Sequence, residues 1–137
     1  MRFQGIRYRA VIIGWAIDII GSILASAIAL PILAPDAGDP QVLGQRLSES
    51  SSLAFALLLL GLMFDLLGGY VAARLAPGEE LRNAIAVGLL SGVSGALQTI
   101  GATDGWPLWL VVAGPILAIP FAAFGGYLRM PPPPSLP

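Results

Sequence analysis

Long apolar stretches alternate with short polar segments along the chain, and this pattern predicts its architecture. Four stretches, residues 10–33, 53–76, 83–102 and 107–128, contain few charged residues. Each is long enough to cross the roughly 30 Å hydrocarbon core of a bilayer as an α-helix. None shows the period-two alternation of a membrane β-strand. We therefore predict that residues 1–137 form a single all-α integral membrane domain, a bundle of four transmembrane helices.

The polar segments carry local signals of their own. Asp39-Pro40 is typical of a helix start, and it predicts a short helix on the membrane surface with Val42, Leu43 and Leu47 on one face. The serines between Ser48 and Ser52 offer caps for the second long helix. Pro77-Gly78 indicates a tight turn, and the Pro-rich tail, residues 130–137, favours an exposed polyproline II segment.

Arginine positions predict how the chain is oriented. Six of the seven arginines fall on one side of the predicted bundle: Arg2, Arg7, Arg9, Arg74, Arg82 and Arg129. The opposite side carries Arg46 beside several acids. Because cytoplasmic loops are rich in arginine and lysine, we predict a multi-pass protein of the bacterial cytoplasmic (inner) membrane with both termini in the cytoplasm.

One alternative concerns the first stretch. An arginine-rich start, an apolar run and Ala25-Ser26-Ala27 are also typical of a signal peptide with its cleavage site. However, the apolar run continues to Leu33 and contains Asp18, which is unusual in the core of a signal peptide. We therefore favour a retained transmembrane helix.

Composition excludes most enzyme chemistry. The chain is 56% hydrophobic and only 11% charged, less than half the charged content of a typical soluble domain. It has no cysteine, histidine or lysine, which excludes thiolate and imidazole ligands, a Ser–His dyad and a Schiff-base lysine. We expect no metal site and no cofactor. The net charge of −1 argues against a nucleic-acid partner.

Small residues recur at every fourth position in all four stretches, and we predict that these faces pack the helices closely. Small side chains let two helix backbones approach each other in lipid, where no hydrophobic effect drives association. The predicted packing glycines are Gly14, Gly61, Gly69, Gly88, Gly92, Gly114 and Gly126. The third stretch is small on nearly all sides, so we expect it to be the central helix.

Two acids lie deep within the predicted spans, and they form the candidate site. Asp18 lies nine residues after Arg9, and Asp65 lies nine before Arg74. Both are thus roughly 13 Å from the arginine boundary, near the bilayer midplane. Ser91 and Pro120 have the same nine-residue separation from their boundary arginines. We therefore predict one layer holding two carboxyls, a hydroxyl and a carbonyl freed by proline, in which the carboxyls cannot both be ionised.

The chain resembles two groups of membrane proteins. Residues 68–75, the acidic turn after them and Asn83-Ala84 resemble several uncharacterised families of small four-helix bacterial membrane proteins. Asp18-Ile19-Ile20-Gly21-Ser22 is similar to the first helix of small multidrug resistance transporters, where a glutamate precedes two hydrophobic residues, Gly and Thr. That resemblance implies that Asp18 binds a proton and a cationic substrate in alternation. The present chain differs in its aspartate, its long first loop, its second acid and its prolines.

These patterns lead to two functional hypotheses. The first is a non-enzymatic structural or accessory protein that associates with itself or with a larger membrane complex, which the small-residue faces favour. The second is a proton- or cation-coupled carrier that uses Asp18 and Asp65, since acids within membranes mark ion sites. An intramembrane aspartyl protease is disfavoured because the chain lacks the Gly-x-Gly-Asp motif.

Overall fold

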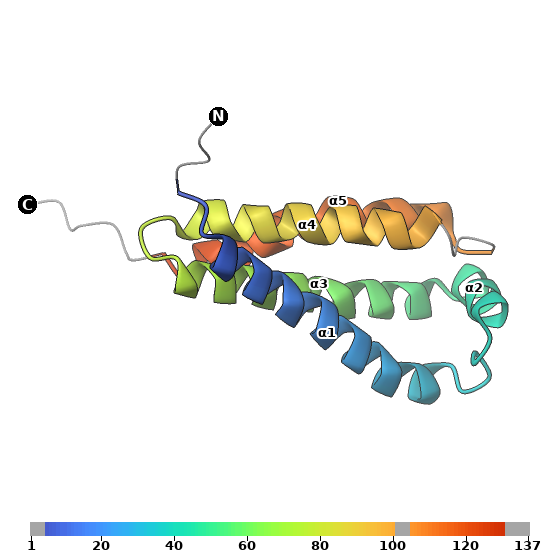
Figure 1. The fold of residues 1–137 in the computed structure, drawn as a ribbon. Coiled ribbons are helices and arrows are strands. Elements are labelled where there is room, and N and C mark those ends of the chain that lie inside the picture. The colour runs from blue at the N-terminus through green and yellow to red at the C-terminus, as the bar shows by residue number, and fades with distance from the viewer. Residues whose placement is uncertain (1–4, 101–104, 131–137) are drawn as a thin grey trace, which may run out of the picture.

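The computed structural model describes residues 5–100 and 105–130, and within them all regular structure is helical (Figure 1). The helices are α1 (Tyr8–Leu33), α2 (Pro40–Glu49), α3 (Ser51–Leu75), α4 (Glu80–Ile100) and α5 (Leu108–Tyr127). Three of them, α1, α3 and α5, are long and apolar enough to cross a membrane. This confirms the all-α class and indicates a membrane protein. The end of the third predicted span and the tail after residue 130 lie outside the described residues.

The short helix and its caps form as their local sequence predicts. The carboxylate of Asp39 caps α2 by accepting a hydrogen bond from the backbone N–H of Gln41 at 2.8 Å, with Pro40 in the first turn. The hydroxyl of Ser50 caps α3 in the same way, accepting from the N–H of Leu53 at 3.3 Å. Both caps satisfy donors that a helix start leaves unpaired.

The most connected helix is α3, which contacts each of the other four. The prediction that residues 83–102 form the central helix is therefore wrong, since α4 contacts only α1, α3 and α5. Two adjacent glycines explain the central position of α3. A Cβ on Gly68 would lie 2.7 Å from the carbonyl oxygen of Gly14 in α1, whereas one on Gly69 would meet the backbone of Ala122 in α5. The two neighbouring glycines thus allow α3 to pack closely against α1 on one face and against α5 on another.

The pair α4 and α5 is packed in the same way along much of its length. A Cβ on Gly88 would lie 2.7 Å from the Cα of Ile119, and one on Gly92 would lie 2.8 Å from the carbonyl oxygen of Pro115. Gly126 of α5 meets Ala84 near the start of α4. The two helices are therefore antiparallel and in close backbone contact.

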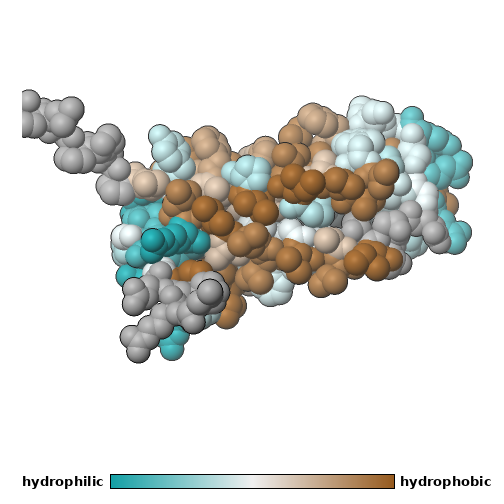
Figure 2. Space-filling view, turned by 90° about the horizontal axis from the view of Figure 1, so that it is seen from above, coloured by the Kyte–Doolittle hydropathy of each residue, from teal (hydrophilic) through white to brown (hydrophobic). Residues whose placement is uncertain are grey.

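The start of α1, the turn between α3 and α4 and the end of α5 lie at the same end of the molecule (Figure 1). The backbone N–H groups of Gly78 and Glu80 lower the pKa of the Glu80 carboxyl at the start of α4, and the nearby guanidinium groups of Arg129 and Arg7 lower it further. On the face drawn in Figure 2, a broad hydrophobic belt separates this hydrophilic end from a second one.

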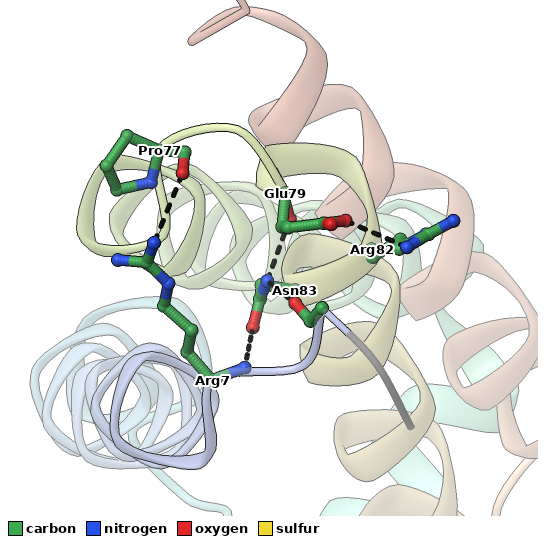
Figure 3. Close-up of polar contacts among 6 residues, drawn as sticks. Arg7, Pro77, Glu79, Arg82 and Asn83 are labelled. Carbon is green, nitrogen blue, oxygen red and sulfur yellow. Dashed lines mark hydrogen bonds and ion pairs between the residues drawn. The ribbon is translucent and has the colours of Figure 1, made fainter. Parts of the chain in front are cut away.

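Hydrogen bonds of Asn83 join the segment before α1 to this end of the bundle (Figure 3). Its side chain is fully buried; its amide oxygen accepts from the N–H of Arg7 at 2.8 Å, and its amide nitrogen donates to the carbonyls of Gly5 and Glu79. Arg7 also donates to the carbonyl of Pro77 at 3.4 Å. The N-terminal end of α1 is thus held by hydrogen bonds.

Towards its other end, α1 diverges from the remaining helices (Figure 1). Its buried residues are Ala10, Val11, Gly14 and Asp18, all in the first half of the helix. From Ile19 to Leu33 no residue of α1 is buried. Ser22, Ser26 and Leu30 of this half line a cavity between α1 and the rest of the bundle.

Candidate functional site

A partly open cavity of about 590 Å³ lies between α1, α3, α4 and α5, with α2 at the end away from Asn83. Its polar lining residues are Asp18, Ser22, Ser26, Asp65, Ser91 and Gln98. The three predicted site residues, Asp18, Asp65 and Ser91, therefore line one and the same cavity, although they come from three helices.

Asp18, Asp65 and Ser91 are also among the few buried polar side chains of the described residues. The hydroxyl of Ser91 donates a hydrogen bond to Oδ2 of Asp18. Ser22, one turn along α1, donates to Oδ1 of the same carboxylate at 3.5 Å. Both oxygens of Asp18 thus have a hydroxyl donor, and the side chain is only 4% exposed.

Asp65 has a different environment. It is 8% exposed, and its Oδ1 is buried without a hydrogen-bond partner among the described residues. Its carboxyl lies close enough to the carboxyl of Asp18 and the hydroxyl of Ser91 to interact with both. Neither Arg nor Lys is among the described residues that line the cavity. Because two adjacent carboxylates repel each other, a proton or a bound cation is needed to compensate them.

The rest of the cavity wall is mainly apolar and extends away from the acids. Leu57, Leu58 and Leu62 line it from α3, and Leu43 and Leu47 close it from α2. These α2 leucines belong to the face that the sequence predicts to be apolar. Trp106 also lines the cavity, and its indole Nε1 is buried without a partner among the described residues.

Two of the predicted packing glycines line this cavity instead of a helix contact. A Cβ on Gly61 would meet no atom within 4 Å, and one on Gly114 would meet only Leu58, at 3.9 Å. The prediction that Gly61 and Gly114 pack helices together is therefore wrong. At both positions the absence of a side chain leaves space open. Gly14, Gly69, Gly88, Gly92 and Gly126 do lie at close helix contacts.

Proline 120 is the part of the predicted layer that the structure places elsewhere. Pro120 is exposed, whereas Pro115, five residues earlier, lines the cavity. Counting residues from the arginine boundary gives the depth of a position but not its direction, since each residue turns the helix by about 100°. The helix itself, α5, continues through both prolines from Leu108 to Tyr127.

Sequence reasoning missed Gln98 and Trp106 as lining residues, and it also missed the structural role of Asn83. Gln98 lies seven residues after Ser91 on α4, and that separation of two turns offers a signal for a shared face. Trp106 offers no such signal, because a tryptophan is equally typical of the membrane boundary. For Asn83, a polar residue in the first turn of a span is equally typical of the membrane surface.

Comparison of the chain with protein-family models, with curated proteins and with solved structures found no match in any of the three.

Proposed function

We propose that this protein is a small carrier of the cytoplasmic membrane that exchanges a proton for a cation at Asp18 and Asp65. The observation that carries the proposal is the cavity, because it connects the acid pair to the opposite end of the bundle. A buried polar cluster that only joins helices needs no such space. A site that loads and releases a cation requires it.

The proposal includes a fourth crossing by α4. Residues 83–100 of α4 contain no charged residue, and the helix runs antiparallel to α5 in close backbone contact from Gly126 to Pro115. If α5 crosses the bilayer, α4 crosses beside it. The start of α1, the α3–α4 turn and the end of α5 carry most of the arginines, so we assign that end to the cytoplasm.

The chemistry follows from the surroundings of the two carboxyls. A proton held between Asp18 and Asp65 would give the unpartnered Oδ1 of Asp65 a hydrogen bond and reduce the charge in the bundle to one. A cation entering the cavity would stabilise both carboxylates in their ionised form and displace that proton. The residues of α4 and α5 that line the cavity opposite the two acids are uncharged, and Ser91 presents its hydroxyl there. The acids therefore have no counter-ion in the cavity among the described residues.

The structural or accessory role is the second candidate, and we rank it lower. The sequence favours that role because faces of small residues could join one copy of the chain to another. Most of these faces are used inside the chain, where Gly14, Gly69, Gly88, Gly92 and Gly126 contact other helices of the same bundle. They therefore supply no separate reason for self-association.

Transport measurements in liposomes test the proposal. The purified protein is reconstituted with a pH-sensitive dye in the lumen, and an inward gradient of sodium, potassium or an alkylammonium ion is applied. We expect at least one cation to drive proton efflux faster than in empty liposomes. In Asp18→Asn and Asp65→Asn the rate should fall to that of empty liposomes.

Asp36→Asn is the matched control, because Asp36 is an exposed carboxylate that pairs with Arg46 outside the cavity. It should transport like the unmodified protein. Helical circular dichroism and a single elution peak show that each variant is folded. The proposal is overturned if no cation moves protons, or if both cavity variants transport at the normal rate.

A further inference from the structure

We infer that the cation bound in this cavity is a single-chain amphiphilic ammonium, with its charged group at Asp18 and Asp65 and its apolar chain directed towards α2. This inference rests on the proposed function and names the class of its substrate. It is carried by the chemistry of the two ends of the cavity and by the two glycines between them.

The inner end suits a group that donates several hydrogen bonds. Asp65 is only 8% exposed and presents an oxygen with no donor among the described residues, beside a second carboxyl at Asp18. An ammonium group carries up to three N–H donors and one positive charge. It can therefore bridge the two carboxyls and neutralise part of their charge.

A bare metal ion fits this end less well. Calcium takes about six to eight oxygen ligands, and magnesium requires nearly ideal octahedral geometry. Near the acid pair the described lining residues offer only the two carboxyls and the hydroxyls of Ser91 and Ser22, and no third acidic side chain joins them. The remaining neighbours are mainly apolar.

The outer part of the cavity suits an alkyl chain. From Asp65 the α3 wall continues through Leu62 and Leu58 to Leu57, a distance of roughly 12 Å along the helix axis. Leu43 and Leu47 of α2 lie at its far end. The total of about 590 Å³ is within the range of cavities that bind small organic molecules.

Gly61 and Gly114 determine the width available to this chain. Gly61 lies one turn before Asp65 on the same face of α3, and a Cβ there would meet nothing within 4 Å. Gly114 faces Leu58 at 3.9 Å. Leucine at either position would occupy space that the apolar chain needs, without touching the carboxyls.

Isothermal titration calorimetry of the purified protein in a non-ionic detergent tests the inference. The ligands are decylammonium, the uncharged decanol, the short ethylammonium and sodium chloride. We expect decylammonium to bind roughly tenfold or more tightly than decanol, because only the ammonium group forms charge-assisted hydrogen bonds with the carboxyls. It should also bind more tightly than ethylammonium, which lacks the chain. Binding should be lost in Asp65→Asn.

Gly61→Leu separates the chain site from the charge site. We expect it to weaken decylammonium binding about tenfold and to leave ethylammonium binding unchanged, and Gly114→Leu provides an independent repeat. Ala56→Leu is the control, because Ala56 is exposed on the same helix and does not line the cavity.

The outcomes distinguish the substrate class from the proposed function. If ethylammonium or sodium binds as tightly as decylammonium and Asp65→Asn abolishes that binding, the amphiphile is wrong and the exchange site survives. If decylammonium binds Asp65→Asn and Gly61→Leu as it binds the unmodified protein, it has only partitioned into detergent, and the inference fails. If no ligand binds and liposomes show no cation-driven proton movement, both proposals fail.

Discussion

The hydroxyl of Ser91 on α4 donates a hydrogen bond to the carboxylate of Asp18 on α1, and so joins two helices at the acid layer. Ser91→Ala removes this donor, so that Oδ2 of Asp18 loses its hydrogen bond. We expect a loss of about 1–3 kcal/mol in the free energy of unfolding, measured by titration with a denaturing detergent. Ser94→Ala is the control, because Ser94 donates only to the carbonyl of Leu90 in its own helix. Equal losses in both variants would contradict a specific role for Ser91.

Gly69 and Gly61 lie on the same helix, two turns apart, and should respond differently to the same substitution. In Gly69→Ala the new methyl group meets the backbone of Ala122, so α3 and α5 must separate. We expect destabilisation of about 1–3 kcal/mol, as for other overpacked contacts, and a lower thermal midpoint. Gly61→Ala enters open space and should be neutral or slightly stabilising. A neutral Gly69→Ala would show that the α3–α5 contact is looser than described.

Asn83 should contribute to stability through its three backbone partners. In Asn83→Ala the N–H of Arg7 and the carbonyls of Gly5 and Glu79 all lose a hydrogen bond. We expect a loss of about 1–3 kcal/mol and faster hydrogen exchange at the Arg7 amide. Gln45→Ala serves for comparison, since that amide bonds only to Glu49 on the exposed face of α2. Unchanged hydrogen exchange at the Arg7 amide would contradict this role of Asn83.

The cap of α2 can be tested at the amide that it protects. Asp39→Ala removes the acceptor for the N–H of Gln41 and should cost about 0.5–2 kcal/mol of local helix stability. Hydrogen exchange of the α2 amides should accelerate. Asp36→Ala removes an exposed ion pair with Arg46, an interaction that contributes at most about 1 kcal/mol, and should leave those amides unchanged.

Features that depend on neighbouring residues were predictable from the sequence. Asp39-Pro40 starts α2 and Ser50 caps α3, because a cap involves residues within three positions of one another. The burial of Asp18 and Asp65 was predicted almost as well. Asp18 and Asp65 are charged residues in apolar helices, and their cost in lipid directs them towards the interior of the bundle.

The use of each small residue was not predictable. Gly61 and Gly69 belong to one row on one helix, yet the first borders the cavity and the second contacts α5. A glycine permits either arrangement, and the choice depends on the path of a helix distant in sequence. The same holds for Pro115 and Pro120, whose directions depend on the rotation of α5 about its axis.

The divergence of α1 has a mechanical consequence. The helix is held at one end, by the hydrogen bonds of Asn83 and the crossing of Gly14 with Gly68, and its far half has no buried residue. Beyond the contact of Gly21 with Phe64, it therefore has an arm of about 18 Å, from Gly21 to Leu33, in which no residue is buried. A tilt of a few degrees at the crossing displaces the free end by several times as much as it displaces Asp18. Lateral pressure from the surrounding lipid on that arm would thus widen or narrow the cavity beside Ser26 and Leu30, which line it, while the carboxyls stay almost still.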